Sequence, residues 1–274
     1  MNKLLLIGGS GMLGTALHYV LSQKHALTML ERSQFDIVKG HWDALSVTGF
    51  DYVINAAGLI NRRQADAGHF YTVNAIFPHV LSTLCAHSGA RLIHFSTDCV
   101  FDGVLGPFLE DSPRDATDLY GTSKMLGEPN LALVIRTSII GPEARNFYNL
   151  LCWALSQNHI NGFTNHLWNG VTTLEIARLV DRIISESLYV EGVRHIFSDD
   201  CSKYELIKMM CGIFTHKAQI TPISAPEPRD TRLRTKYPEL HRTIGIRSME
   251  RQLKDLLAVT QPNGHWVNNR GAAE

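Results

Sequence analysis

Residues 7–14 read Ile-Gly-Gly-Ser-Gly-Met-Leu-Gly, and this glycine-rich stretch decides the fold. It follows the apolar run Lys3 to Ile7 and opens a segment of helical period, Met12 to Gln23. Glycines at such a turn let the backbone approach a pyrophosphate, whose charge meets free N–H groups at the helix start. The stretch fits both G-x-G-x-x-G and G-x-x-G-x-x-G, so it predicts dinucleotide binding without naming the subfamily. The residues expected at the pyrophosphate are Gly8, Gly11, Met12, Leu13 and Gly14.

Strand-like and helix-like segments alternate along the first half of the chain. The strand-like runs are apolar nearly throughout, as strands covered on both faces must be. The predicted strands are Lys3 to Ile7, Ala26 to Leu30, Tyr52 to Asn55, Arg91 to Phe95 and Leu131 to Arg136. The predicted helices are Met12 to Gln23, Phe70 to His87 and Asp118 to Gly127. This alternation indicates an α/β fold with a doubly wound parallel sheet.

The second half of the chain has a looser pattern. Residues 147–157 have helical period, and residues 172–187 predict a strong amphipathic helix. Residues 221–238 are rich in proline and predict an irregular, loop-rich segment. Residues 261–274 are polar and predict a flexible tail.

These patterns predict two unequal domains. We expect a dinucleotide-binding domain at residues 1–145 and a smaller α/β substrate domain formed mainly by residues 146–260. Parts of residues 160–195 are candidates to pack back onto the first domain. The sequence leaves the choice between a monomer and a homodimer open.

Composition narrows the classes of partner. The 274 residues carry 26 basic and 26 acidic side chains, so no overall field favours nucleic acid or an anionic membrane. The five cysteines have no C-x-x-C spacing, and the thirteen histidines have no metal-ligand spacing. We therefore expect a cytoplasmic protein without a disulfide framework and without a metal.

Charged residues follow the second predicted strand, where the ribose of a dinucleotide binds. Glu31 is the residue type that binds a ribose 2′-hydroxyl, and Arg32 with Ser33 is the type that binds a 2′-phosphate. Both types are present, so NADP is favoured and NAD stays possible. Asp36 and Ile37 are candidates for the adenine edge. After the next strand, Asn55, Ala56, Ala57 and Gly58 offer small side chains where the cofactor needs room.

A tyrosine and a lysine four residues apart follow the fourth predicted strand. The spacing of Tyr120 and Lys124 puts both side chains on one helix face. A shift of the tyrosine pKa from about 10 to neutrality requires roughly 4 kcal/mol, which a lysine ammonium at ~4 Å can supply at an effective dielectric constant of about 20. Thr97, at the strand end, would hold the substrate oxygen while Tyr120 moves the proton. We predict Thr97, Tyr120 and Lys124 as the catalytic residues, with Tyr120 and Lys124 also contacting the cofactor.

These motifs resemble the extended short-chain dehydrogenase/reductases, and within them the dTDP-4-dehydrorhamnose reductase group. The similar stretches, within residues 1–140, are Gly8 to Gly14, Val53 to Ala57, Val73-Asn74, Phe95 to Gly103, Tyr120 to Glu128 and Arg136 to Ser138. The resemblance implies a Rossmann-like domain and reduction of a 4-keto group on a nucleotide-activated deoxysugar, for polysaccharide sugar synthesis. It also implies that Asn74 and Ser96 contact the cofactor and that a C-terminal domain closes over the sugar nucleotide.

The substrate residues are less closely defined. The resemblance places Asn146, Trp168 and Asn169 at the sugar nucleotide, with a core role for Trp168 as the alternative. Arg232, like Arg229, has the side chain for bidentate binding of a diphosphate. Asp98 and Cys99 are candidates for the sugar side, against a turn role for Asp98 and a plain buried thiol at Cys99.

Two alternative functions remain open. A cysteine acid at position 99, paired with His159 or His166, would suit an epimerase-reductase similar to GDP-fucose synthase. A catalytically silent, NADP-binding regulatory subunit, such as that of methionine adenosyltransferase, also resembles this group. The Asp98-Cys99 pair stands where a 4,6-dehydratase would have Asp-Glu, which disfavours dehydration.

Overall fold

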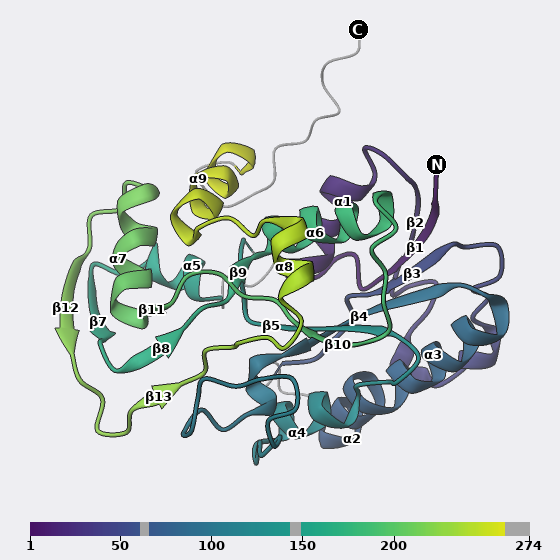
Figure 1. The fold of residues 1–274 in the computed structure, drawn as a ribbon, viewed down its shortest axis with the longest axis horizontal. Coiled ribbons are helices and arrows are strands. Elements are labelled where there is room, and N and C mark those ends of the chain that lie inside the picture. Colours follow the sequence, from purple (N-terminus) through teal and green to yellow (C-terminus); the bar gives the residue numbers. More distant parts are fainter. Residues whose placement is uncertain (61–65, 143–148, 261–274) are drawn as a thin grey trace, which may run out of the picture.

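The protein is represented by a computed structural model that describes residues 1–60, 66–142 and 149–260 (Figure 1). In the described chain, six parallel strands form the main sheet, in the order β2-β1-β3-β4-β5-β10. Their bounds are β1 Lys3–Ile7, β2 Ala26–Leu30, β3 Tyr52–Asn55, β4 Arg91–Thr97, β5 Leu133–Thr137 and β10 Gly192–His195. The predicted doubly wound parallel sheet is confirmed. The strand order reverses between β1 and β3, so a crevice for ligands is expected at their carboxyl ends.

Two of the strands differ from the prediction in a way that matters for the site. β4 continues two residues beyond the predicted end at Phe95, so Ser96 and Thr97 belong to the strand itself. β10 was not predicted, because its sequence Gly-Val-Arg-His has no apolar run. It pairs with β5 at the edge of the sheet, where three of its four residues are only partly buried.

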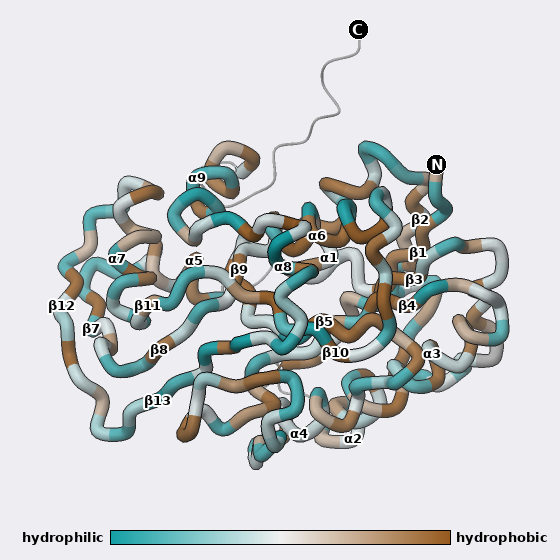
Figure 2. Tube along the Cα trace, in the orientation of Figure 1, coloured by the Kyte–Doolittle hydropathy of each residue, from teal (hydrophilic) through white to brown (hydrophobic). Residues whose placement is uncertain are grey.

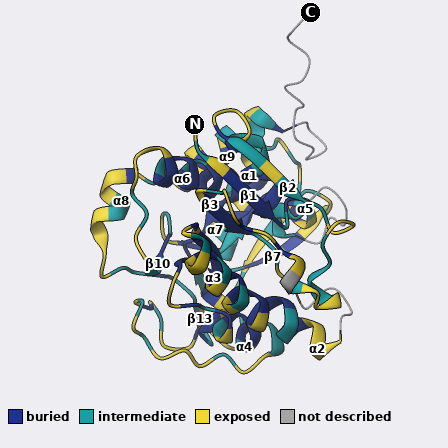
Figure 3. Cartoon of the chain, turned by 90° about the vertical axis from the view of Figure 1, so that its right-hand side faces the viewer, coloured by how far each residue is buried: buried dark blue, intermediate teal, exposed yellow. Residues whose placement is uncertain are grey.

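Helices cover both faces of the sheet. α1 (Met12–Leu21) and α6 (Thr173–Ser185) share one hydrophobic core with the sheet, and α3 (Phe77–Ser88) helps to form the core on the other face (Figure 3). The predicted helix from Phe70 to His87 is interrupted. It begins with α2 (Ala67–Phe70), widens into a π-helical turn at Tyr71–Ile76 and continues as α3.

The rest of the chain forms a second lobe beside the carboxyl end of the sheet (Figure 1). Its own core contains Trp168, Leu206 and Leu253, and brown apolar stretches line it in Figure 2. The strands outside the main sheet are β6 Ile139–Ile140, β7 His159–Phe163, β8 His166–Trp168, β9 Val171–Thr172, β11 Cys201–Ser202, β12 Gln219–Ile223 and β13 Arg229–Asp230. The remaining helices are α4 Leu119–Leu126, which lies under the sheet, α5 Leu150–Ala154, α7 Lys203–Ile213, α8 Pro238–Ile244 and α9 Met249–Val259.

Some predicted features fall outside this description or differ from it. Residues 221–238 are not wholly irregular, because they contain the end of β12, β13 and the start of α8. The predicted tail 261–274 and Asn146 lie outside the described residues. Within the described ranges, no helix is long and apolar enough to cross a membrane, and no three His, Cys, Asp or Glu side chains are grouped as metal ligands. The five cysteines are free thiols.

Candidate active site

The glycine turn packs tightly against the loop after β3. Gly8 has a φ of +81°, and a Cβ atom there would lie 2.5 Å from the backbone nitrogen of Ala57. A Cβ atom at Gly14 would lie 2.1 Å from the carbonyl oxygen of Gly8. Gly11 caps α1 without a side-chain hydrogen bond, so the N–H groups of the first turn, which contains Met12 and Leu13, face no side-chain cap. This cradle has the shape and the dipole for an anion.

A buried pair of side chains supports that loop from below. The Asn55 side chain accepts a hydrogen bond from the Ala57 nitrogen at 3.2 Å and lies 3.1 Å from His94 Nδ1. Because the Asn55 amide nitrogen can only donate, Nδ1 is the acceptor and His94 is neutral. Burial, followed by the charge of Lys124, holds the His94 pKa well below its usual value. The predicted space at Ala56, Ala57 and Gly58 is therefore fixed by buried neighbours.

Asn74 lies in the π-helical turn and is fully buried. Its amide bonds the backbone nitrogen and oxygen of Leu59 and donates to Ser123 in α4. The side chain thus ties the loop after β3 to the helix that carries the predicted catalytic pair. Its polar atoms are used inside the protein, so a direct cofactor contact stays a prediction.

The predicted ribose residues lie together after β2. The Arg32 side chain is 76% exposed and its Nε lies 3.3 Å from Asp36 Oδ2, while Ser33 is exposed beside it. Glu31 is half-buried and its backbone nitrogen donates to Gln34. Asp36 caps the short 3₁₀ helix Ile37–Lys39, and its carboxylate accepts a hydrogen bond from the Val38 nitrogen. A contact of Asp36 with the adenine stays a prediction. An exposed ion pair of this kind is worth about 1 kcal/mol or less, so Arg32 is free to exchange partners.

Thr97, Asp98, Cys99 and Tyr120 meet at the end of β4. The Thr97 hydroxyl donates to Asp98 Oδ1 at 3.2 Å and accepts from the Cys99 nitrogen at 3.1 Å. It also lies close enough to the Tyr120 phenol to act on the Tyr120 pKa. Asp98 is buried, and Ser138 lies close enough to its carboxylate to act on its pKa. The Cys99 side chain is exposed, yet the protein around it and the Asp98 charge raise its pKa to about 12. The thiol of Cys99 is therefore protonated near neutral pH. Its side chain is exposed, which differs from the alternative of a plain buried thiol.

The expected lowering of the Tyr120 pKa by Lys124 is not found in this structure. Burial, followed by Cys99, raises the Tyr120 pKa well above its usual value, and Lys124 is not among the leading influences. Lys124 is buried and donates instead to the Phe95 carbonyl oxygen at 2.7 Å. Burial lowers the Lys124 pKa to about 8. Tyr120 stays protonated at neutral pH, which suits a proton donor.

Ser96 belongs to a buried ionic network behind the site. Its hydroxyl donates to Glu128, which binds Arg136 through two hydrogen bonds of 2.6 and 2.7 Å. The Glu128 and Arg136 side chains are each 3% exposed, and Arg114 adds a third cationic contact. The hydroxyl predicted for the cofactor is therefore used to anchor α4 to β4 and β5.

The predicted substrate residues of the second lobe are mostly committed to other residues. Trp168 is 2% exposed and lies in the core of this lobe, so the core interpretation describes its place. The buried Asn169 amide bonds Asp200 and the backbone of Leu233. Every guanidinium nitrogen of Arg232 bonds Asp230 or Asp200, so diphosphate binding would require an exchange of partners.

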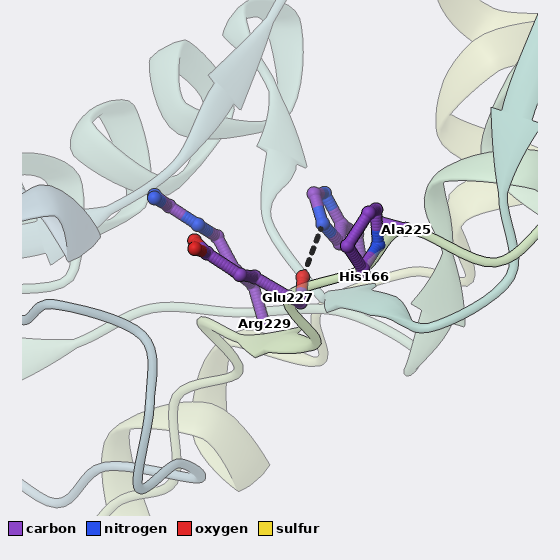
Figure 4. Close-up of a pocket in the computed structure, with 5 residues that line it drawn as sticks. His166, Ala225, Glu227 and Arg229 are labelled. Atoms are coloured by element: carbon purple, nitrogen blue, oxygen red, sulfur yellow. Dashed lines mark hydrogen bonds between the residues drawn. The ribbon is translucent and has the colours of Figure 1, made fainter.

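An open pocket of about 460 Å³ lies at the edge of the second lobe (Figure 4). It is lined by His166, Ala225, Pro226, Glu227 and Arg229. His166 is bonded to the Glu227 carbonyl oxygen at 3.1 Å, while Arg229 is exposed and bonds no other described side chain. The residues that line this pocket belong neither to the glycine turn nor to the end of β4. The pocket is therefore separate from the predicted catalytic residues.

Sequence reasoning missed Lys203, the first residue of α7. The run Ser-Lys-Tyr-Glu at 202–205 is a capping box, which signals a helix start and nothing about chemistry. In the fold, Lys203 is the cation that acts on the Asp98 pKa, and its ammonium lies 4.7 Å from the Trp168 ring centroid. The second lobe thereby brings a cation to the catalytic strand end.

The chain is similar in sequence to proteins of one family. The sequence pattern of the family described as the RmlD substrate binding domain matches residues 1–261. The chain is 27% identical over 272 residues to the spore coat polysaccharide biosynthesis protein SpsK of Bacillus subtilis, covering 90% of this chain and 93% of SpsK. It is 34% identical over 151 residues to the dTDP-4-dehydrorhamnose reductase of Mycobacterium tuberculosis, covering 50% of this chain and 49% of the reductase. The chain thus aligns with about half the length of that reductase.

The fold also matches solved structures. The dTDP-4-dehydrorhamnose reductase of Bacillus anthracis, solved in complex with NADP, superimposes with a TM-score of 0.77 and 21% identity. The match covers 95% of this chain and all of that structure. At this identity the likeness describes the arrangement of both lobes, and it agrees with the two-lobed fold described above.

Proposed function

The chain belongs to the family described as the RmlD substrate binding domain, and on that premise we propose that it reduces the 4-keto group of a nucleotide-activated deoxysugar with NADPH. The candidate substrate is dTDP-4-dehydrorhamnose, because relatives 30% and 34% identical to about half of the chain are named as its reductases. The likeness to SpsK supports a role in polysaccharide synthesis. The five free thiols support a place in the cytoplasm.

The observation that carries this proposal is the closeness of the Tyr120 phenol and the Thr97 hydroxyl at the carboxyl end of β4, where Thr97 acts on the Tyr120 pKa. Open α/β sheets bind their ligands at this edge, beside the point where the strand order reverses. A proton donor and a second hydroxyl at one strand end suit the oxygen of a ketone.

The glycine cradle supports a dinucleotide as cofactor. A side chain at Gly8 would collide with the backbone of Ala57, so the turn keeps its surface bare. The uncapped start of α1 offers N–H groups to a pyrophosphate, and Arg32 with Ser33 offers donors to a 2′-phosphate. When bound, NADPH supplies the hydride that becomes the new C–H bond of the sugar.

The chain's own residues handle the oxygen and the proton. Thr97 exchanges its contact with Asp98 for the substrate carbonyl oxygen, and Tyr120 donates its proton to that oxygen as negative charge develops there. The phenolate left behind regains a proton from water, while the Lys124 ammonium holds α4 to β4 through the Phe95 carbonyl oxygen. The first-lobe residues therefore supply one proton for each hydride delivered.

The test is NADPH oxidation at 340 nm with dTDP-4-dehydrorhamnose. We expect Tyr120→Phe to lower kcat by about a hundredfold or more while the Kd for NADPH changes less than about threefold. Tyr237→Phe, at an exposed tyrosine, is the matched control and is expected to keep full activity. Retained turnover in Tyr120→Phe would refute the proton-donor role. NADPH binding by wild-type protein without any turnover would favour the regulatory-subunit alternative.

A further inference from the structure

Lys203 has a cationic head without an acceptor. The side chain is partly buried and its ammonium lies 4.7 Å from the Trp168 ring centroid. It makes no hydrogen bond or ion pair with any residue that the structure describes. An ammonium carries three donors, and this one is not fully buried, so water can accept from it in the free protein. A ligand that displaces this water has to supply an acceptor in its place.

Lys203 lies near the catalytic strand end, because its charge acts on the Asp98 pKa. Ser138 lies close enough to the Asp98 carboxylate to act on its pKa, and a Cβ atom at Gly170 would touch both the Ser138 carbonyl oxygen and the Trp168 ring. These contacts connect the end of β4 to the ring on which Lys203 rests. Burial lowers the Lys203 pKa, while Asp98, Cys201 and Cys99 act in the opposite direction. The Lys203 ammonium and the charged groups at the end of β4 therefore influence one another's pKa values.

The charges around Lys203 select the kind of acceptor. Asp98 disfavours a phosphate group beside it, because two like charges in a poorly solvated site repel each other. A neutral sugar hydroxyl or ring oxygen can accept from the ammonium without that penalty. The position next to Thr97 also puts this acceptor near the reacting carbonyl rather than near the diphosphate.

We propose that Lys203 is a substrate-specificity residue of the second lobe, whose ammonium binds an oxygen of the sugar ring beside the reacting carbonyl. This inference rests on the proposed reduction of a sugar nucleotide. Trp168 acts here as a positioning residue, because its buried ring fixes the direction of the lysine stem.

The experiment compares two ligands by calorimetry in the presence of NADP⁺. One is dTDP-rhamnose, the product of the proposed reaction, and the other is dTDP alone. Lys203→Met keeps the apolar stem over Trp168 and removes the charge. We expect this variant to bind dTDP-rhamnose about ten- to a hundredfold more weakly, the effect of losing one charge-assisted hydrogen bond. Binding of dTDP should change less than about twofold.

Two further variants complete the design. Lys203→Arg keeps the positive charge and is expected to bind dTDP-rhamnose more tightly than Lys203→Met does. Lys208→Met lies on the same helix, where the lysine faces the Tyr204 ring at 6.0 Å, and is expected to bind both ligands as wild type does. Unchanged NADP⁺ binding in every variant shows that the first lobe is folded.

The outcomes separate this inference from the proposed function. Equal loss of dTDP and dTDP-rhamnose binding in Lys203→Met would assign the lysine to the diphosphate and overturn the inference. Unchanged binding of dTDP-rhamnose would overturn it as well, with the proposed function intact. Wild-type protein that binds neither ligand would overturn the proposed function and this inference together.

Discussion

The Lys124 ammonium donates a 2.7 Å hydrogen bond to the carbonyl oxygen of Phe95, two residues before Thr97 on β4. The bond crosses from α4 to the backbone of the catalytic strand, so it fixes the distance between the strand and the helix that carries Tyr120. Burial lowers the Lys124 pKa to about 8, which places its titration within reach of ordinary buffers.

The first prediction concerns pH. The ammonium form of Lys124 makes the stronger hydrogen bond to the Phe95 carbonyl oxygen and so holds β4 against the helix that carries Tyr120. We therefore expect kcat/KM to fall as pH rises through about 8. Lys124→Arg should move this decline beyond pH 10. The folded pKa lies below the value of 10.5 expected for the unfolded chain, so the contribution of Lys124 to the free energy of unfolding rises over the same pH range. A flat profile to pH 9.5 in the wild type would contradict this assignment.

The second prediction concerns the ion pair of Glu128 and Arg136. Glu128→Gln leaves Arg136 buried without its counter-charge, which should lower the free energy of unfolding by about 3–5 kcal/mol in urea titrations. Glu186→Gln removes one partner of an exposed pair with Arg182 and should leave stability unchanged. Equal changes in the free energy of unfolding for the two substitutions would show that burial does not determine how much the Glu128–Arg136 pair contributes to stability.

The third prediction concerns the glycine turn. Gly8→Ala adds a methyl group 2.5 Å from the Ala57 nitrogen, at a φ of +81°. Gly40→Ala faces the same conformational cost at a φ of +75° but meets no atom within 4 Å. We expect both to lower the melting temperature, and Gly8→Ala alone to weaken NADPH binding by about tenfold or more. Equal NADPH affinities of the two variants would argue against the cradle as the pyrophosphate site.

The fourth prediction concerns cofactor choice. Arg32→Ala should weaken NADPH binding by about tenfold or more, because an arginine at a 2′-phosphate makes charge-assisted hydrogen bonds, and should leave NADH binding unchanged. Arg242→Ala, at an exposed arginine paired with Glu239, is the control and should change neither. Fluorescence titration with both cofactors decides the matter. Wild-type preference for NADH would transfer the role to Glu31.

The fifth prediction concerns Cys99 and the epimerase-reductase alternative. With a pKa of about 12, the thiol stays protonated near neutral pH, which is the form that an acid requires. The proposed reduction takes its proton from Tyr120 and does not use this thiol. Cys99→Ala should therefore keep reduction within about threefold of wild type, and the wild-type product formed in deuterium oxide should carry no solvent deuterium on a ring carbon. Ring deuterium that disappears in Cys99→Ala would establish epimerisation.

The sheet was predictable because its signals are local. A continuous apolar run before a glycine turn predicts a buried strand from sequence alone, as at Lys3–Ile7. β10 has no such run, because an edge strand covered by few neighbours needs few apolar residues. The π-helical turn at Tyr71–Ile76 was not predictable, since its amide contacts at Asn74 join segments distant in the chain.

The site was predictable only where residue type decides chemistry. Tyr120 and Thr97, which lie close together in the fold, are two residues that motifs had indicated. Lys203 carries no motif for a crevice, and its place depends on how α7 meets β8. The ion pair between Arg232 and Asp200 was likewise hidden, because Asp200 lies 32 residues away in the sequence.

The path of the chain through α6 and β10 limits how the protein can be divided. Both elements follow the first strands of the second lobe in sequence, yet α6 packs against α1 and β10 completes the edge of the sheet. A fragment that stopped at residue 145 would leave the apolar side of α1 bare to water. The two lobes are therefore not modules that can be expressed or exchanged separately. Because the chain passes between the lobes more than once, any relative rotation of the lobes must change the backbone at several connecting segments at the same time.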